Sequence, residues 1–364
     1  MNVGMLLQFQ GRAHESDAEM YQQELRLALE AEAMGFDRIM AVEHHFTNYA
    51  MCPDNAQFLS YVAAKTSTIE LMPSAFILPW NDPVRVAEKA ILLDHLSGGR
   101  AAIGMGRGLA RREFDSFRVD MSESRARYDE SAAMIVEALE TGFIEGDGPF
   151  YPQPRTELRP RPLESFKGRS YMVGGSPGSL VTAARLDLGV MQFGTAPTDD
   201  AYAVWDGYRS AYVGEHGNDP LPLMTADLVV CHPDAKKAEE YARKYQADYW
   251  FLVMNHYELL STHFEDTRGA YDTYAQLAET LRNDKDNASA DAYVDNNLYG
   301  DPAQILDQLR AKYEKFGGLQ LALMPSYADM PYDVVWDSLK LFADKVLPEI
   351  KSWAPVSAAA GVGG

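Results

Sequence analysis

Three short runs of the sequence combine residue types that can move a proton or bind an anion. The run EHH occupies residues 43–45, GMGRG occupies 104–108, and GGSPGS occupies 174–179. Imidazoles titrate near neutral pH and suit acid–base chemistry, whereas arginine and a serine at a helix start suit phosphate. The runs are far apart in the chain, so only the fold can bring them into one site.

The adjacent histidines His44 and His45 follow an apolar run that we interpret as a strand. Neighbouring side chains on a strand point to opposite faces, so one of the two is expected to face the site. The alternative is a hydrogen-bonded pair with a structural role only. No other histidine or cysteine stands at a ligand spacing from them, so we predict no metal site.

The run at 174–179 predicts a phosphate site. Two glycines allow a ligand to approach the backbone, and Ser176 followed by Pro177 is typical of a helix start, whose free amides attract anions. Ser176 and Ser179 can add hydroxyl hydrogen bonds. Arg107, between two glycines, can clamp the same phosphate, although plain helix capping and a surface salt bridge remain alternatives. The run GMGRG lacks the third glycine of a dinucleotide fingerprint.

Short apolar runs alternate with segments of helical period along the chain. Ser16 and Glu19 predict a capping box for the first helix, and Asp82 with Pro83 predicts the start of another that ends near Gly98. A helix is expected at 122–139, and the polar segment 146–168 is expected to be a long loop. The predicted strands are 3–9, 38–42, 69–77, 101–106, 170–175, 189–193, 221–230 and 319–324.

Eight strands alternating with helices indicate an α/β fold, a (β/α)8 barrel, with a doubly wound open sheet as the alternative architecture. We expect one barrel domain over residues 1–354 and a disordered tail over 355–364. The acidic segment 261–299 interrupts the alternation before the last βα unit. We interpret it as a lid over the site, the alternative being a solvated excursion without a role.

The charge balance excludes some partners. With 33 Lys and Arg against 53 Asp and Glu, the formal net charge is −20. Such a field repels nucleic acid and anionic membrane surfaces, so we expect neither as a partner. Two cysteines, no visible signal peptide and no apolar run of membrane-spanning length favour the cytoplasm.

Several runs together resemble a known family. The resemblance lies in residues 35–37, EHHFT at 43–47, PVR at 83–85, SGGR at 97–100 and RGL at 107–109. It continues in Leu78-Pro79, Leu93-Asp94, Gly104, Ser124-Arg125, Thr267-Arg268-Gly269 and SLKLF at 338–342. The chain is thus similar over nearly its whole length to the bacterial luciferase-like flavin-dependent monooxygenases, and most to their luciferase α subunits.

The resemblance implies a usually dimeric (β/α)8 barrel that receives reduced FMN from a separate flavin reductase. Reduced FMN and dioxygen would form a flavin 4a-hydroperoxide, which oxygenates a small organic substrate. His44 would match the histidine that assists this chemistry. Arg107, Gly175, Ser176 and Ser179 would match the surroundings of the FMN phosphate.

The same resemblance assigns further residues to the cofactor. Ser74 and Ala75 would match a non-proline cis peptide beneath the flavin ring, and Glu43, Gly106 and Leu109 lie in the matching runs. Three of these positions depart from the luciferase pattern. Gly106 replaces a reactive cysteine, Gly175 an acidic residue and Ser179 a threonine. The first departure argues against light emission, so we predict a monooxygenase, not a luciferase.

Two other functions remain open. A deazaflavin-dependent oxidoreductase that transfers hydride is one, because some relatives of this fold bind a deazaflavin. A flavin-binding subunit without turnover is the other, although His44 and Arg107 speak against it. Apolar residues near the strand ends favour an uncharged or partly apolar substrate, unless they belong to the core: Phe46, Tyr49, Met51, Phe76, Met105 and Phe193.

Overall fold

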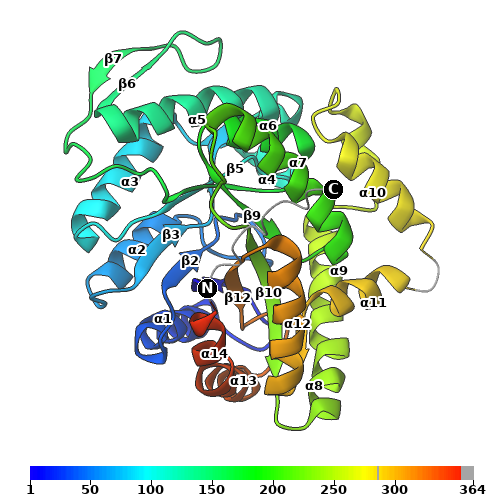
Figure 1. The fold of residues 1–364 in the computed structure, drawn as a ribbon. Coiled ribbons are helices and arrows are strands. Elements are labelled where there is room, and N and C mark those ends of the chain that lie inside the picture. The colour runs from blue at the N-terminus through cyan, green and yellow to red at the C-terminus, as the bar shows by residue number, and fades with distance from the viewer. Residues whose placement is uncertain (285–286, 354–364) are drawn as a thin grey trace, which may run out of the picture.

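The computed structural model describes residues 1–284 and 287–353. Within them, parallel strands form a nearly closed barrel with helices around it (Figure 1). The strand order is β3-β2-β1-β12-β10-β9-β8-β5-β4. The bounds are β1 Val3–Leu7, β2 Arg38–Ala41, β3 Glu70–Pro73, β4 Phe76–Ile77, β5 Ile103–Gly106, β8 Ser170–Val173, β9 Gly189–Phe193, β10 Met224–Cys231 and β12 Gln320–Met324.

The eight strands expected from the sequence are all present, and the (β/α)8 barrel is confirmed. The strand expected at 69–77 is divided into β3 and β4 at the Ser74-Ala75 bond. A parallel bridge between Leu71 and Ala101 joins β3 to the segment before β5, so the two ends of the sheet meet. The open, doubly wound sheet is therefore wrong.

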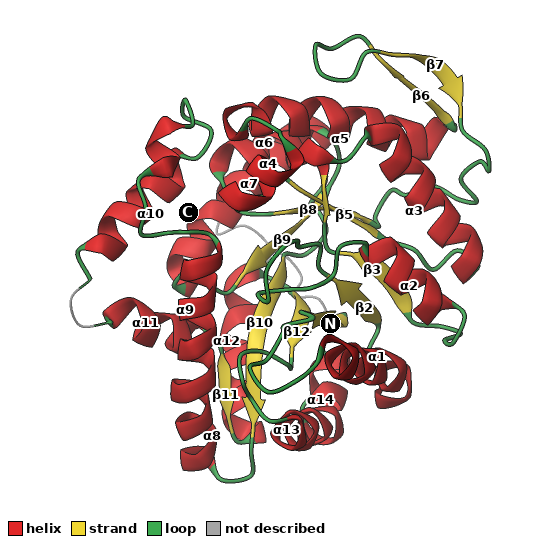
Figure 2. Cartoon of the chain, turned by 180° about the vertical axis from the view of Figure 1, so that it is seen from behind, coloured by secondary structure: helices red, strands yellow, loops and turns green. Residues whose placement is uncertain are grey.

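Helices cover the outside of the barrel, as the view from behind also shows (Figure 2). The first of them begin at the predicted caps: Ser16 and Glu19 form the capping box, and Asp82 accepts hydrogen bonds from two amides. The helices are α1 Asp17–Met34, α2 Asn55–Ala63, α3 Pro83–Ser97, α4 Arg111–Phe117, α5 Ser124–Thr141, α6 Pro177–Arg185, α7 Thr198–His216, α8 Ala235–Tyr241, α9 Ala247–His256, α10 Asp272–Arg282, α11 Ala288–Asn296, α12 Pro302–Phe316, α13 Tyr332–Lys345 and α14 Leu347–Ser352.

The segment expected to be a long loop, 146–168, contains the second strand of a β-hairpin. Strands β6 (Phe143–Gly146) and β7 (Gln153–Glu157) pair antiparallel and project away from the barrel (Figures 1 and 2). The prediction failed because β7 is polar and contains Pro154. An exposed edge strand tolerates both features, since it buries no face and has a free hydrogen-bonding side.

The acidic segment 261–299 is more ordered than a bare loop. It contains the 3-10 turn His263–Asp266 and helices α10 and α11, and it runs into a short strand, β11 (Leu298–Gly300), that pairs with β10. Residues 285 and 286 of this segment lie outside the described residues, as does the tail expected at 355–364. The division into a barrel of 1–354 and a tail remains a prediction.

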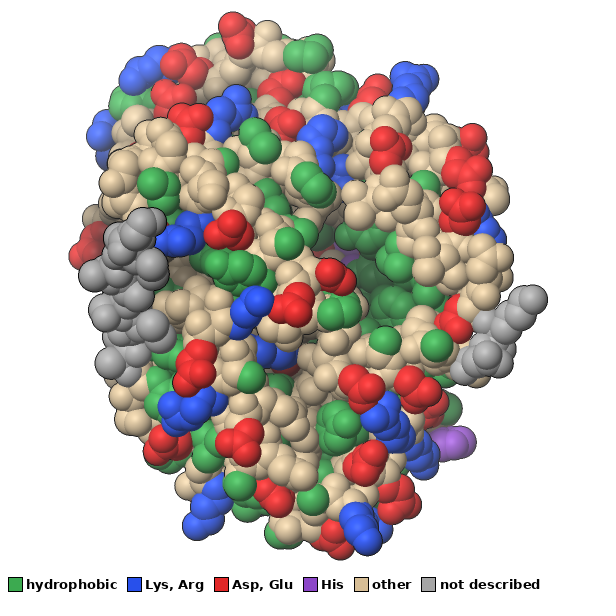
Figure 3. Space-filling model, turned by 45° about the vertical axis from the view of Figure 1, so that its right-hand side comes forward, with side chains coloured by type: hydrophobic (Ala, Val, Ile, Leu, Met, Phe, Trp, Pro, Cys, Tyr) green, Lys and Arg blue, Asp and Glu red, His purple; other side chains and the backbone are tan. Residues whose placement is uncertain are grey.

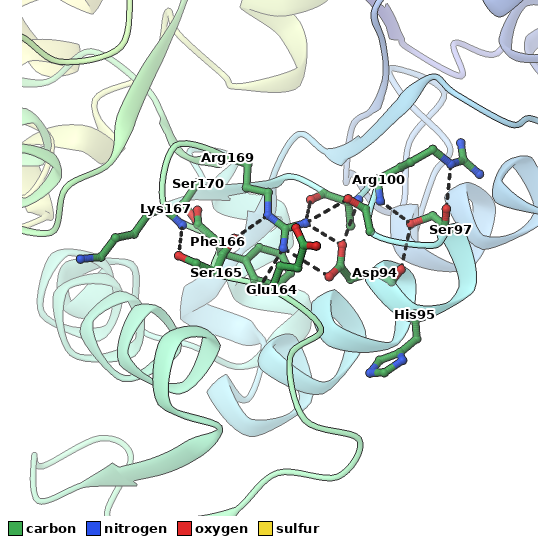
Figure 4. Close-up of polar contacts among 12 residues, drawn as sticks. Asp94, His95, Ser97, Arg100, Glu164, Ser165, Phe166, Lys167, Arg169 and Ser170 are labelled. Atoms are coloured by element: carbon green, nitrogen blue, oxygen red, sulfur yellow. Dashed lines mark hydrogen bonds and ion pairs between the residues drawn. The ribbon is translucent and has the colours of Figure 1, made fainter.

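A buried ion pair fixes the strand starts on one side of the barrel (Figure 4). The Arg169 guanidinium donates to Asp94 Oδ1 at 2.6 Å and to the Ala101 carbonyl at 2.7 Å. Arg100 donates to the Ile69 carbonyl at 2.7 Å and the Ala63 carbonyl at 3.1 Å, which ties the segment before β5 to the end of α2. These matching residues, Asp94 and Arg100, therefore serve the fold.

The helices of the described residues differ from membrane-spanning helices in length and apolarity. None of them is long and apolar enough to cross a bilayer.

Candidate active site

The candidate site forms where loops leave the carboxyl ends of β2, β5 and β8 and meet the end of α9. In a parallel barrel these ends share one rim, where functional groups of such barrels gather. Helices α8 and α9 continue each other through a π-helical turn at Ala242–Gln246 (Figure 1). This long helix brings His256 and Tyr257 to the rim from a distant part of the chain.

His44 is surrounded by polar and aromatic side chains at this rim. Its Nδ1 atom is 3.0 Å from Glu113 Oε1, and its Nε2 atom is 3.3 Å from the Tyr257 hydroxyl. The ring packs edge-on against Tyr49 and His256. Only 14% of the side chain is exposed, so the imidazole is held in one place.

Glu113 is the hydrogen-bond acceptor that these groups around His44 share. The residue is 1% exposed, and its Oε1 atom accepts the His45 amide at 2.8 Å besides meeting His44 Nδ1. His256 Nε2 lies 3.8 Å from the same oxygen. One carboxylate oxygen is therefore shared by two imidazoles and a backbone amide.

The neighbouring rings stay uncharged. Burial, together with nearby His44 and Arg112, lowers the pKa of His256 to about 2. Burial also raises the pKa of Tyr257 well above its ordinary value, and that of Tyr49 as well. The hydroxyls of Tyr257 and Tyr49 therefore remain hydrogen-bond donors at neutral pH.

His44, Glu113 and His256 also offer ligand atoms within 4.8 Å of one another, as a small metal site would. The contact between His44 and Glu113 is already a hydrogen bond, and His256 Nδ1 pairs with the Thr47 hydroxyl at 3.1 Å. Hydrogen bonding thus accounts for these contacts, and the absence of a metal remains a prediction.

Glu43 and His45 belong to a different set of contacts. Glu43 accepts hydrogen bonds from the Trp80 indole and the Asn81 amide, both at 2.9 Å, and from the Ile77 backbone at 3.3 Å. His45 packs against Phe117 and Trp80. The Glu43 carboxylate is therefore occupied by protein donors, which indicates a role in holding the loop; its predicted contact with the cofactor stays untested.

A cavity of about 530 Å³ contains the predicted phosphate residues Arg107 and Ser176. Besides these two, its lining includes Ser122, Arg125, Ala126, Pro177, Gly178 and the run 268–274. Arg107 and Ser176 thus face one space, and residues 268–274 of the segment 261–299 form one wall of it; their predicted role in binding a phosphate stays a prediction.

Arg125, which the sequence analysis did not assign, makes the direct contacts to the two serines. Its guanidinium donates to Ser179 Oγ at 2.8 Å and to Ser176 Oγ at 2.9 Å. Burial and the nearby charge of Arg107 lower its pKa. Two cations are therefore held close together, an arrangement that an anion between them would stabilise.

Arg107 does not form the surface salt bridge that was its alternative. The guanidinium donates to the Ala270 carbonyl and lies over the Tyr271 ring, 4.0 Å from its centre. Among the ion pairs of residues 1–284 and 287–353, neither Arg107 nor Arg125 has a carboxylate partner. Ser176 begins α6 but makes no capping hydrogen bond with its side chain, which is engaged by Arg125 and Ser179.

A third feature lies at the ends of β3 and β5. The Ser74-Ala75 peptide bond is cis, as the resemblance implied. A side chain at Gly106 would place its Cβ 3.2 Å from Ala75 Cβ and 3.0 Å from Ile77. Glycine at 106 therefore lets the end of β5 pack closely against the cis peptide, where a larger residue would crowd Ala75 and Ile77.

The remaining predicted residues have less distinctive positions. Leu109 is half-buried beyond β5, and Gly175 is half-buried beside Gln192. Among the apolar candidates, Phe76 and Met105 are core residues with at most 1% exposure, whereas Phe46 and Phe193 are exposed. Tyr49 is buried against His44.

The sequence analysis missed Glu113, Arg125, His256 and Tyr257. Arg125 stands in one of the matching runs, so its charge beside Ser124 was an available signal. Glu113 could have been suspected as an acid six residues after Arg107. Nothing local in the sequence marks His256 and Tyr257, because their place in the site depends on the path of the long helix.

Comparison with known proteins agrees with this geometry. A family model described as luciferase-like monooxygenase matches residues 1–320. The chain belongs to this family. The alkanal monooxygenase alpha chain of Photorhabdus luminescens is 26% identical over 343 residues, covering 92% of this chain and 94% of the relative. This luciferase-like chain is thus an oxidoreductase by family, as expected from its sequence.

Solved structures share the fold of this luciferase-like monooxygenase. The oxygenating constituent of 3,6-diketocamphane monooxygenase from Pseudomonas putida, in complex with FMN, is 20% identical with a TM-score of 0.73, covering 96% of this chain and 98% of that one. An F420-dependent secondary alcohol dehydrogenase is 15% identical with a TM-score of 0.70, covering 95% and 98%. Both FMN and deazaflavin enzymes therefore use this barrel.

Proposed function

We propose that this chain is the oxygenating component of a two-component monooxygenase that uses reduced FMN and dioxygen on a small, largely apolar substrate. One observation carries the proposal. Arg107, Arg125 and Ser176 line a single cavity on the rim where His44 and the cis peptide Ser74-Ala75 also lie. FMN needs both: a site with positive charge for its phosphate, and a neighbouring place on the rim for its ring.

The residues fit the phosphate of the cofactor. A phosphate group offers several acceptor oxygens, and two guanidinium groups and two hydroxyls are the donors that bind it best. Arg107 and Arg125 lack carboxylate partners among the described residues, so neither must break an ion pair to bind it. When bound, reduced FMN would supply the electrons that activate dioxygen.

The protein's own groups would bind and position the cofactor and move protons. The cavity residues would hold the phosphate, and the flavin ring would lie beside the cis peptide Ser74-Ala75. His44 would hold or release a proton near the reacting edge. The space-filling view shows a hollow lined largely by hydrophobic side chains, with a histidine visible inside, which favours a substrate with little charge (Figure 3).

The role of His44 is tested by replacing it with alanine. His44→Ala should lose product formation by roughly 100-fold or more, the usual worth of a general acid or base, while its affinity for FMN stays unchanged. The measurement is product yield with reduced FMN from a generic flavin reductase, beside FMN binding by fluorescence. Unchanged product yield would remove His44 from the chemistry.

A deazaflavin-dependent hydride transfer is the second candidate, favoured by the shared barrel of the F420-dependent dehydrogenase. Titration with FMN and with a deazaflavin separates the two, because a hydride-transfer enzyme consumes no dioxygen. Oxygen uptake without any substrate-dependent product would instead support a flavin-binding subunit without turnover.

The proposal includes the surroundings of the enzyme. Reduced FMN would come from a separate reductase, the chain would pair as a homodimer, and both would work in the cytoplasm. The segment 261–299 would act as a lid, because its residues 268–274 already line the cavity. Excluding water from the cavity would protect the activated oxygen from decay before it reaches the substrate.

A further inference from the structure

We propose that Glu113 is a positioning residue that keeps the proton of neutral His44 on Nδ1, so that Nε2 is the atom available for proton transfer. The inference rests on the proposed function of His44 and adds Glu113, His256 and Tyr257 to it. It is carried by the contacts of these four side chains, which come from the loop after β2, from α4 and from the end of α9.

The first step is the contact at Nδ1. A carboxylate only accepts hydrogen bonds, so a ring nitrogen 3.0 Å from Glu113 Oε1 must carry the hydrogen. The same oxygen accepts the His45 amide at 2.8 Å, which fixes the carboxylate relative to the loop that carries His44. Because Glu113 is 1% exposed, water does not compete for this bond.

The second step is the contact at Nε2. In a neutral ring with its hydrogen on Nδ1, Nε2 has a free lone pair and can accept a hydrogen bond. The Tyr257 hydroxyl lies 3.3 Å from this atom and donates to it. Tyr257 would thus mark the position from which an incoming group delivers its proton.

The third step is the shared carboxylate. His256 Nε2 lies 3.8 Å from Glu113 Oε1, so two imidazoles face one negative charge. His256 is 3% exposed and bonds the Thr47 hydroxyl through Nδ1 at 3.1 Å, which suits a neutral ring. Glu113 therefore remains free to stabilise the imidazolium of His44 when Nε2 takes up a proton.

The chain's other nearby groups do not offer a competing partner for Nδ1. Tyr49 packs edge-on against the His44 ring and pairs its hydroxyl with that of Tyr249 at 3.0 Å. Glu43 faces His45 instead, 3.4 Å from its Nε2. Among the described residues, Glu113 is thus the acid in contact with His44.

The tautomer can be read directly in protein with ¹⁵N-labelled histidine rings, by long-range proton–nitrogen NMR correlation without any cofactor. His44→Gln identifies the signals. We expect a single tautomer with hydrogen on Nδ1 in the wild type. In Glu113→Gln both tautomers should appear, because an amide offers an acceptor and a donor, and product yield should fall at least tenfold with unchanged FMN affinity.

Tyr257→Phe should keep the Nδ1 tautomer, since Glu113 sets it, and a matched control is Tyr208→Phe. Tyr208 lies on α7, and its buried hydroxyl donates to the carbonyl of Leu188, just before β9, so its loss should alter neither reading. Hydrogen on Nε2 in the wild type, or a single unchanged tautomer in Glu113→Gln, would overturn the inference. So would full product yield in Glu113→Gln with mixed tautomers.

These readings separate the two proposals. If the wild-type tautomer is as expected but His44→Ala keeps its product yield, the proposed role of His44 fails while the arrangement set by Glu113 stands. If His44→Ala loses product but the tautomer is the opposite one, only the inference about Glu113 fails.

Discussion

At the scale of single residues, the anion site depends on two arginines that differ in their contacts. Arg125 reaches Ser176 and Ser179, whereas Arg107 reaches the Ala270 carbonyl and the Tyr271 ring. Arg125 therefore sets the geometry of the serines, and Arg107 connects the site to the segment 261–299. A phosphate between them would relieve the repulsion of the two charges.

Replacing either arginine tests this account. Arg107→Ala and Arg125→Ala should each weaken FMN binding by about 1.5–3 kcal/mol, the worth of a hydrogen bond to a charged group. Fluorescence titration with FMN measures the affinity. Arg209→Ala is a matched control, because Arg209 is exposed and pairs with Asp219 on the surface. An unchanged affinity in both test variants would mean that this cavity does not bind the FMN phosphate.

Sequence reasoning found Arg107 and His44 but not their partners. A strand end followed by glycine, arginine or histidine is a local pattern that a sequence displays. The contacts of Arg125 with α6, or of His256 with Glu113, join segments more than 50 residues apart. Such contacts depend on the closure of the barrel and have no local pattern.

At the scale of elements, the segment 261–299 is latched to the loop after β5. The Tyr271 hydroxyl donates to the Gly108 carbonyl at 2.7 Å, and the Arg107 guanidinium donates to the Ala270 carbonyl. The latch sits beside the arginine that would hold the phosphate. Cofactor binding and the position of this segment should therefore affect each other.

The latch is tested by Tyr271→Phe, which removes the hydroxyl but keeps the ring under Arg107. Limited proteolysis within 261–284 should become about 2- to 10-fold faster, the effect of one hydrogen bond on an opening equilibrium. Tyr274→Phe is the matched control in the same segment, since no hydrogen bond of its hydroxyl occurs within the described residues. Equal cleavage rates for wild type and Tyr271→Phe would argue against the latch.

The ion pair of Asp94 with Arg169 predicts a loss of stability without a loss of binding. Asp94 is fully buried and Arg169 is 15% exposed, so Asp94→Asn leaves a largely buried cation unpaired. The free energy of unfolding in urea should fall by about 3 kcal/mol, the low end for breaking a buried pair. FMN affinity should not change. A loss of unfolding free energy below about 1 kcal/mol would mean that the pair contributes no more than an exposed salt bridge.

At the scale of the whole molecule, the sequence predicted the barrel strands better than the hairpin β6–β7 and the short strand β11 outside them. Short, mainly apolar runs such as 38–42 and 319–324 mark strand positions, because parallel barrel strands are buried on both faces. Strand β7 is polar and exposed, and β6 and β11 are too short, at four and three residues, to display a period of their own. Their pairing partners, not their own composition, make them strands.

Global stability should depend on pH through His256. Its pKa is about 6.5 when unfolded and about 2 when folded, so below pH 6.5 the unfolded chain binds a proton that the native chain does not. Stability from this group is therefore complete above pH 6.5 and falls as the pH drops, by at most about 1.4 kcal/mol per pH unit.

The comparison with His256→Gln isolates this effect. Buried Glu24, whose pKa is raised to about 7 by burial, has the opposite dependence and is present in both proteins. Urea unfolding from about pH 7 to about pH 5 should show a steeper decline for wild type than for the variant. Parallel curves would mean that His256 accepts a proton in the folded protein.

The most direct test of the central claim is a crystal structure of the protein soaked with FMN. The account predicts the phosphate between Arg107 and Arg125, within hydrogen-bond distance of Ser176, and the flavin ring beside Gly106 with His44 near its edge. A phosphate bound elsewhere, or a ring on the far side of the barrel, would contradict it.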